Sequence, residues 1–155
     1  MDRKKSFLTA YHLKEDKLIQ MANKKFPNST LTHNANSNYA LISNPEPYQL
    51  SSQWTGQFSK NDLAVLNIET GLSKIIIKGN PSISRLSPKG NYAFGYNQID
   101  TTWYTYNIKT EKYTELTKGK QFYNELNDTP NYPRSYGSAG WTKNDKRILI
   151  YDRYD

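Results

Sequence analysis

The feature that most constrains the fold is a pair of alternating segments that match each other. LAVLNIETG begins at Leu63 and WYTYNIKTE begins at Trp103, so that Asn67-Ile68 in the first aligns with Asn107-Ile108 in the second. Apolar or aromatic residues occupy every second position in both, which is the period of a β-strand with one buried face. Each segment runs into a polar turn signal and then into a second short strand, LSKIIIKG or KYTELTKG. The sequence therefore predicts two β-hairpins.

A second piece recurs before the hairpins, in which a polar turn precedes a short apolar strand. It appears as LTHNANSNYALIS from Leu31, LSPKGNYAFGY from Leu86 and WTKNDKRILIY from Trp141. The repeating unit is then a turn, a strand, a variable loop and a hairpin, with a period of roughly 40 to 55 residues, which is typical of four-stranded propeller blades. The prediction is an all-β fold of two to three antiparallel four-stranded blades of a β-propeller, in an incomplete ring.

The approximate units of this partial propeller domain are residues 10–80, 81–120 and 136–155, with the last blade truncated. Residues 118–138 are rich in Pro and Asn and are expected to form an inserted surface loop. Two alternatives stay open near the start of the chain: an amphipathic helix from about Tyr11 to Lys24, or a hairpin that turns at Lys14 to Lys17. Their position before a blade favours the hairpin.

The composition of the chain excludes some classes of function and disfavours others. Hydrophobic residues make up 35% of the chain and aromatic residues 14%, which favours sheets with half-buried rings over disorder. There is no cysteine, which excludes disulfides, thiolate metal sites and cysteine nucleophiles. The net charge is +7, but no nucleic-acid-binding motif accompanies it, so a solvated surface is favoured over nucleic-acid binding.

No apolar run is long enough for a signal peptide or a membrane span, and no membrane partner is expected. The compartment is left open, because a periplasmic or exported parent protein would have lost its signal. The apolar run Ile148–Tyr151 indicates a strand with no turn signal after it, which suggests a chain cut from a longer protein.

Two stretches carry a resemblance to a known family. The turn Ser87–Gly90 resembles the Ser-Pro-Asp-Gly turn of TolB-like and WD-like propeller repeats. The stretch PNYPRSYGSAGWTKNDKRILIYDRYD resembles the propeller of bacterial serine peptidases of the prolyl oligopeptidase family, through Tyr136–Trp141 and Tyr151–Asp155. Asn44–Gly56 and the following DLAVLNIETG are similar to an earlier blade of that domain.

The resemblance implies a non-catalytic propeller segment that helps gate the access of peptides to an active site outside this chain. In that family the propeller accompanies an α/β-hydrolase domain that carries the Ser, Asp and His of a catalytic triad. The implied partners are that hydrolase domain and the peptide substrates of the parent peptidase, and no cofactor is implied.

The residues themselves support neither catalysis nor metal binding. Gly137–Gly140 does not fit the G-x-S-x-G nucleophile motif, and His12 and His33 are the only histidines. His33 lies in a polar turn, where a surface histidine is the simpler interpretation. The acidic cluster in residues 125–128 lacks the spacing of a calcium loop. No catalytic, cofactor-binding or metal-ligating residue is predicted.

Four side chains are the candidates for facing a peptide or partner: Arg134, Tyr136, Trp141 and Arg153. The arginines could hold a carboxylate or pair locally with Asp128, Asp152 or Asp155, and a local pair is favoured. Aromatic rings near loops rich in Pro and Gly could line a peptide or sugar groove, whereas packing between blades is the favoured interpretation. These rings are Tyr48, Trp54, Tyr132, Tyr136 and Trp141.

A second hypothesis is a standalone β-rich module that binds a peptide, a glycan or a protein partner. An open fan of sheets leaves unpaired backbone groups at its edges, so this module would have to protect them, and self-association is one way to do so. A cooperatively melting monomer would favour a self-contained fold, whereas soluble aggregates would favour a fragment.

Overall fold

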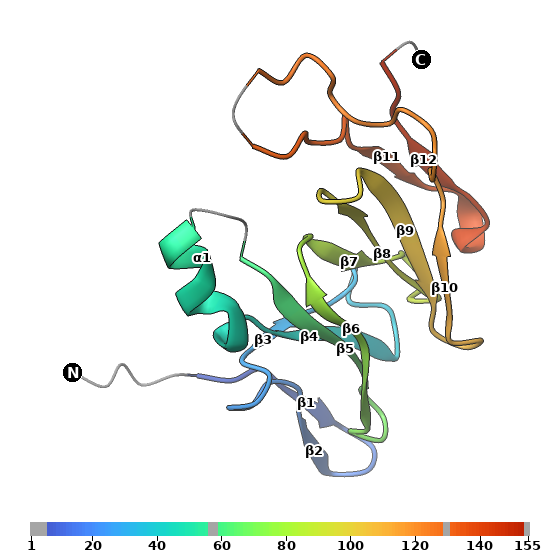
Figure 1. The fold of residues 1–155 in the computed structure, drawn as a ribbon. Helices are drawn as coiled ribbons and strands as arrows, with labels where there is room; N and C mark the ends of the chain where they lie inside the picture. The colour runs from blue at the N-terminus through green and yellow to red at the C-terminus, as the bar shows by residue number, and fades with distance from the viewer. Residues whose placement is uncertain (1–5, 56–58, 129–130, 154–155) are drawn as a thin grey trace.

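The structure is a computed structural model that describes residues 6–55, 59–128 and 131–153. Within these residues the chain forms twelve β-strands, one α-helix and two short 3-10 helices (Figure 1). Every pairing between these strands is antiparallel. The predicted all-β fold class is confirmed.

The strands form two four-stranded sheets and two hairpins, and each sheet keeps the order of the chain. The first sheet is β3 (Asn28–Thr30), β4 (Tyr39–Asn44), β5 (Asn61–Asn67) and β6 (Ser73–Asn80). The second is β7 (Ser84–Leu86), β8 (Tyr92–Asn97), β9 (Thr102–Asn107) and β10 (Lys112–Glu115). The hairpins are β1 (Thr9–His12) with β2 (Lys17–Gln20), and β11 (Ser138–Trp141) with β12 (Ile148–Ile150).

The hairpin β1–β2 decides between the two alternatives for the start of the chain. Thr9 pairs with Gln20 and His12 pairs with Lys17, so the turn spans residues 13–16. Ile19 is buried while Leu18 before it is exposed, which is the alternation of a strand with one buried face. The hairpin is confirmed, and the helix over this stretch is excluded.

Strand β4 shows how the layers stack. Ala40 and Ile42 lie in a cluster with Phe26 from the segment after β2. Leu41, which points to the opposite face of the sheet, lies in a cluster with Leu86 of β7. The first sheet is therefore packed on the N-terminal hairpin layer by one face and on the second sheet by the other.

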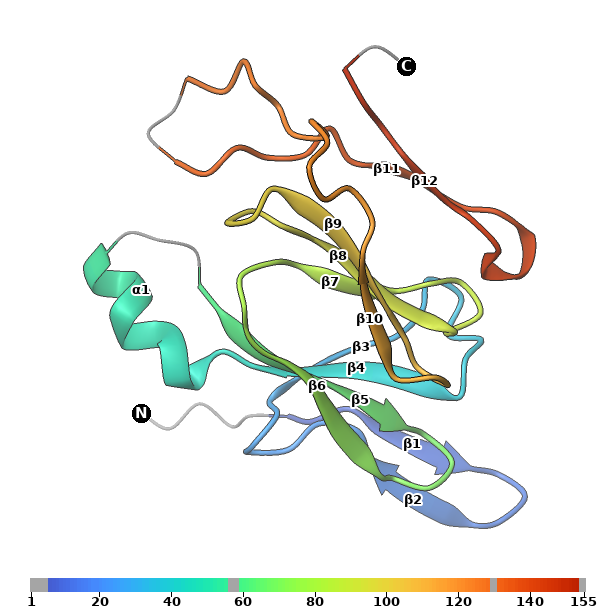
Figure 2. The same ribbon diagram turned by 45° about the vertical axis from the view of Figure 1, so that its right-hand side comes forward.

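The second sheet repeats this arrangement one layer further on. Phe94 and Trp103 form its outer cluster, against which Trp141 and Ile148 of the last hairpin pack. The molecule is thus a stack of hairpin, sheet, sheet and hairpin, as Figures 1 and 2 both show. Because the central strands are buried on both faces, consecutive residues such as Leu63–Leu66 are all buried, and short strands suffice to build a core from few apolar residues.

A turn of the same geometry recurs three times along the chain. The turns begin at Thr32, Ser87 and Thr142, which are evenly spaced in the sequence. In each, the carbonyl of the first residue accepts the N–H three positions further on, at 2.8 to 3.1 Å. The residue that donates this N–H has a φ of 48°, 73° or 55°. The side-chain oxygen of the first residue also accepts a backbone N–H four or five positions later. The internal repeat is therefore present in the backbone and in its hydrogen bonds.

The hairpins β5–β6 and β9–β10 recur at a shorter interval than the turns, because the connections before them differ in length. The connection between β4 and β5 holds η1 (Glu46–Tyr48) and α1 (Gln49–Thr55), whereas residues 98–101 alone join β8 to β9. This helix was missed by the sequence analysis, which assigned Asn44–Gly56 to a blade. Asn44 Oδ1 accepts the Glu46 N–H at 3.0 Å and begins the helical segment.

The predicted inserted loop lies between β10 and β11. In its described part the only β contact is an isolated bridge between Tyr123 and Ser135. The third turn contains η2 (Lys143–Asp145), and β12 follows it. The strand predicted over Ile148–Tyr151 is thus present, and it ends one residue earlier, at Ile150.

Candidate functional site

The stack has two edges with different connections (Figures 1 and 2). We call one the turn rim, because short turns join the strands there: residues 31–38, 68–72, 87–91, 108–111 and 142–147. We call the other the loop rim, because it carries α1 and the described parts of the long loop before β11: residues 45–55, 59–60, 81–83, 98–101, 116–128 and 131–137. Long loops on a rigid scaffold are the usual carriers of binding sites, which directs attention to the loop rim.

A cleft of about 800 Å³ opens at the loop rim. Its walls come from both four-stranded sheets, from the link between β6 and β7, and from residues 134–138 at the end of the long loop. This volume falls within the range of about 300–1,000 Å³ that is usual for ligand sites. The cleft is the candidate functional site.

The charge of the cleft is one-sided. Arg85 of β7 and Arg134 of the long loop line it, and both residues are exposed. Among the described lining residues there is no Asp or Glu, while seven are Ser or Thr. Hydroxyls can donate or accept hydrogen bonds, but only the arginines carry a formal charge here. The cleft is thus suited to a ligand that is anionic and polar.

The wall that carries Arg85 is fixed by a buried hydrogen-bond network. The Asn80 side chain donates to the Ser84 hydroxyl at 2.8 Å and to the Ser82 carbonyl at 3.0 Å. The Tyr104 hydroxyl lies 2.6 Å from the Ser84 hydroxyl, and burial raises the pKa of Tyr104. Tyr104 therefore stays neutral and can hold the start of β7 in place.

A glycine allows this network to form. A Cβ on Gly95 would lie 2.8 Å from the Tyr104 hydroxyl and 3.0 Å from the Ile83 carbonyl. Any larger residue would push β8 away from the Tyr104 ring or from the β6–β7 link. Gly95 is therefore a packing requirement of the cleft wall.

The loop wall that carries Arg134 is fixed as well. The Asn124 N–H donates to the Arg134 carbonyl at 2.7 Å, and Ser135 next to it forms the bridge with Tyr123. On the other side, the Tyr96 hydroxyl donates to the Pro133 carbonyl at 3.2 Å. Burial, with a smaller effect from Tyr123, raises the pKa of Tyr96 to about 12, so its hydroxyl remains a donor at neutral pH.

Two buried polar atoms of cleft residues have no hydrogen-bond partner within the described part of the chain: Gln98 Oε1 and Trp103 Nε1. Trp103 is only 6% exposed, so water does not readily reach its ring N–H. Buried polar atoms without partners are rare in folded proteins, because each costs about 1–3 kcal/mol. Trp141 Nε1 is a third such atom, but Trp141 does not line the cleft. Two residues of the cleft lining thus each carry a buried polar atom without a partner among the described residues.

Of the four candidate residues from the sequence, only Arg134 lines the cleft. The Tyr136 hydroxyl donates to Asn124 Oδ1 at 3.3 Å, within the long loop. The Trp141 ring stacks on Tyr92 at 5.3 Å, so it packs between layers. Arg153 forms an ion pair with Glu125, a residue distant in sequence, while its predicted partner Asp155 lies outside the described residues.

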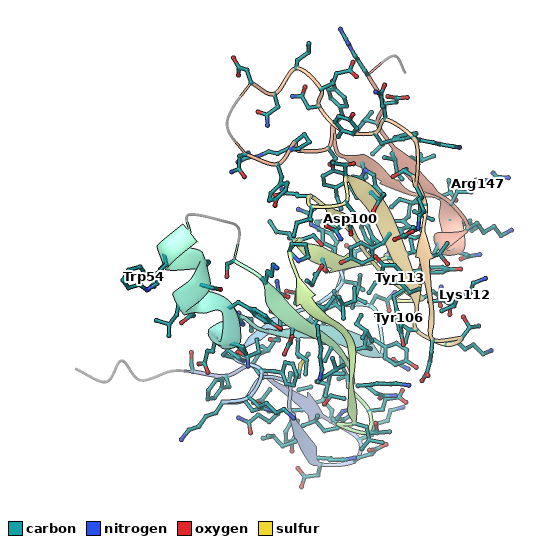
Figure 3. The ribbon with its side chains drawn as sticks, viewed as in Figure 1. Trp54, Asp100, Tyr106, Lys112, Tyr113 and Arg147 are labelled. Atoms are coloured by element: carbon teal, nitrogen blue, oxygen red, sulfur yellow. The ribbon has the colours of Figure 1, made fainter. Side chains whose placement is uncertain are left out.

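Arg134 has no ion-pair partner among the described residues, so the predicted pair with Asp128 is absent from this part of the chain. The aromatic candidates Tyr48 and Trp54 lie on the helical segment and not on a loop. The Tyr48 hydroxyl donates to Asp62 Oδ1 at 2.7 Å, while the Trp54 side chain is 88% exposed and points away from the stack (Figure 3).

Arg85, Gln98 and Trp103 line the cleft but were not predicted from the sequence. Alternation places Arg85 on the face opposite Ser84 and Leu86, but no local pattern shows that a cleft lies there.

Neither histidine lines the cleft. His12 Nε2 lies 2.9 Å from the Ile68 carbonyl near the turn rim, and His33 is exposed in the turn after β3. The described residues contain no group of three His, Cys, Asp or Glu that could hold a metal ion. They also contain no helix that is long and apolar enough to cross a membrane.

Comparison of the chain with family models, with curated proteins and with solved structures gave no match. The geometry and the charge of the cleft are therefore the basis for a functional proposal.

Proposed function

We propose that the chain is a non-catalytic part of a β-propeller, and that this propeller belongs to a serine peptidase similar to prolyl oligopeptidase. A propeller blade is a four-stranded antiparallel sheet in chain order, and blades pack face to face around an axis. The two four-stranded sheets and the even spacing of the three turns support this assignment. The last hairpin then begins a third blade, and the hydrolase domain with its triad lies outside this chain.

The observation that carries the functional part is the cleft at the loop rim. Its volume of about 800 Å³ is sufficient for a short peptide, and its described walls hold no histidine and no carboxylate that could act as a general base. A cleft of this kind can bind and select peptides but has no groups to hydrolyse them. Its role is to contact short peptides on their way to the active site of the parent peptidase.

Peptide binding and hydrolysis should be measured on the same purified chain. Isothermal titration with short proline-containing peptides is expected to give saturable binding, while chromatographic analysis of the same mixtures is expected to show no cleavage. Cleavage that follows the chain through successive purification steps would contradict the non-catalytic role. The absence of binding to every peptide would contradict the peptide-contacting role.

The assignment to a longer peptidase has its own test. The intact mass of the native product, together with the gene sequence beyond the codon for Asp155, should show a longer chain with a downstream G-x-S-x-G motif, Asp and His. A native product that ends at Asp155 would favour the second candidate function.

The second candidate is a standalone module that binds a peptide, a glycan or a protein partner through the same cleft. The Tyr96 and Trp103 rings and the seven hydroxyl-bearing Ser and Thr residues of the cleft favour this alternative, since such groups also recognise sugars. Sedimentation and thermal melting distinguish the two. A monodisperse monomer that melts cooperatively favours the module, whereas self-association through open sheet edges favours a fragment of a ring.

A further inference from the structure

The two arginines of the cleft occupy fixed positions without a counterion. Arg85 lies on β7, where it pairs with Phe94 of β8. Arg134 lies on a loop segment whose carbonyls accept hydrogen bonds from the Asn124 N–H and from the Tyr96 hydroxyl. Neither side chain forms an ion pair with a described residue. By contrast, Lys74, Lys118 and Arg153 each pair with a glutamate. The cleft therefore keeps two cationic groups available for a ligand.

Arginine is suited to carboxylates in particular. Its planar guanidinium presents parallel N–H donors that match the two oxygens of a carboxylate, and such bidentate pairs are among the stronger hydrogen bonds in proteins. Since the described lining contains no acidic group, no carboxylate within it competes for these donors.

The hydroxyls of the lining can pair with a peptide main chain. Seven of the described lining residues are Ser or Thr, whose hydroxyls donate and accept hydrogen bonds, and a peptide main chain offers both carbonyls and N–H groups. An inorganic anion or a phosphate group offers acceptors alone.

We infer that the cleft binds an extended peptide by its carboxylate, with Arg85 and Arg134 as the carboxylate-binding residues. This inference deepens the proposed peptide-contacting function and rests on it. The carboxylate comes either from the C-terminus of the peptide or from an acidic side chain.

The test uses three peptides that share one sequence of uncharged residues. The first has a free C-terminus, the second is amidated at the C-terminus and is the fully neutral peptide, and the third is amidated and carries a single internal Glu. Their affinities are measured by isothermal titration with this chain and, where the native product is longer, with that product. Loss of one charge-assisted contact is expected to weaken binding by about tenfold or more, so the fully neutral peptide should bind at least tenfold more weakly than one of the carboxylate peptides.

The variants Arg85→Ala and Arg134→Ala should each reduce the difference between the carboxylate and neutral peptides toward one. The matched control is Arg147→Ala, because Arg147 is an exposed arginine on the turn rim, away from the cleft (Figure 3). This control should keep the full difference. Far-ultraviolet circular dichroism of each variant verifies that the sheets are retained.

The outcomes separate the inference from the function on which it rests. Equal binding of the three peptides, with no effect of the arginine variants, overturns carboxylate recognition but leaves peptide binding in place. No binding of any peptide overturns both. Tighter binding of the free C-terminus or of the internal Glu supports the inference and identifies the source of the carboxylate.

Discussion

Replacing Asp145 with Ala should detach the last hairpin from the second sheet. Asp145 belongs to the third turn and is 3% exposed. Its carboxylate lies against the turn 87–91 of the preceding layer. It accepts the Ser87 hydroxyl at 2.6 Å, the Asn91 side-chain amide at 3.1 Å, the Lys89 N–H at 3.1 Å and the Asn91 N–H at 3.3 Å. One side chain therefore links two layers through four donors.

The decrease in the free energy of unfolding depends on which of these donors can be hydrated after the substitution. Lys89 and Asn91 are exposed residues and can be rehydrated, whereas Ser87 is fully buried and would keep an unsatisfied hydroxyl. Hydrogen bonds to charged groups contribute about 1.5–3 kcal/mol each, and the left-handed φ of 55° adds about 1 kcal/mol for Ala. Relief of the buried charge offsets part of this loss. The expected decrease in the free energy of unfolding is about 3 kcal/mol.

Urea denaturation followed by circular dichroism measures this decrease. Asp145→Asn keeps the shape and one acceptor oxygen, so it should lose about 1–2 kcal/mol. The control Asp128→Ala, at an exposed position of the long loop, should change stability by less than about 0.5 kcal/mol. Hydrogen exchange should accelerate in β12 before β4 and β5. For Asp145→Ala, a loss below about 0.5 kcal/mol, the size expected of an ordinary surface substitution, would refute this reasoning. Faster exchange in β4 with β12 still protected would refute it as well.

Three further substitutions test the packing elsewhere. A Cβ on Gly90 would lie 1.8 Å from Ser37 Oγ, whereas on Gly119, with nearly the same φ, it meets nothing within 4 Å. Gly90→Ala should therefore cost about 1–3 kcal/mol more than Gly119→Ala in urea denaturation, and equal losses would contradict contact between successive turns. Because the pKa of Tyr96 is raised to about 12, the folded chain keeps this proton after the unfolded chain has lost it. Stability should then fall as the pH rises from about 10 to 12, by no more than about 1 kcal/mol per pH unit, since the hydroxyl is only partly removed from water. Tyr96→Phe should flatten this dependence in pH-resolved melts, and an unchanged slope would count against the burial of Tyr96. Trp54→Ala should change the free energy of unfolding by less than about 0.5 kcal/mol and should remove a red-shifted component of the fluorescence; a larger loss would show that the Trp54 ring packs on the stack.

The strands could be predicted from the sequence because their signals are local. Alternation in LAVLNIETG and WYTYNIKTE, with a turn signal after each, identified the hairpins β5–β6 and β9–β10. The single buried face that this alternation predicted was wrong, because β5 and β9 are buried on both faces between neighbouring layers. The preference for a hairpin at the start of the chain was also confirmed, although the alternation of these residues is weak. This hairpin forms because it packs on the outer face of the first sheet.

Helix α1 could not be predicted in the same way. Leu50 and Trp54 have the spacing of one helical face, but both are exposed, so no buried face produces a strong periodic pattern. Tertiary contacts hold the segment in place instead: Tyr48 bonds to Asp62, and Asp62 also accepts the Gly79 N–H at 3.0 Å. A helix of seven residues depends on such contacts more than on its own propensity.

Most residues of the cleft could likewise not be predicted from the sequence. Its walls combine side chains from both sheets and the long loop, and which face of β7 lines a cleft depends on how the layers stack. Arg134 could be identified because it lies in a polar loop, but Arg85 lies in a strand, where an arginine is ordinarily a solvated residue. The same reasoning explains Asp145, which belongs to a polar turn in sequence and is buried only because its donors come from the preceding unit.

If the proposed peptide binding holds, the two rims of the stack divide stability from binding. On the turn rim, successive turns contact one another through Asp145 and Gly90, so the repeat is preserved there by packing and hydrogen bonds. On the loop rim, connections range from the short link 81–83 to the long loop 116–137, and the arginines are held in a cleft without an ion-pair partner among the described residues. The rims lie at opposite ends of the strands, so a substitution on one should not affect the other. Asp145→Asn should lower the free energy of unfolding and leave peptide affinity unchanged, whereas Arg134→Ala should lower peptide affinity and leave the free energy of unfolding unchanged. Such a separation lets a repeated scaffold keep its stacking contacts while its cleft acquires a ligand preference of its own.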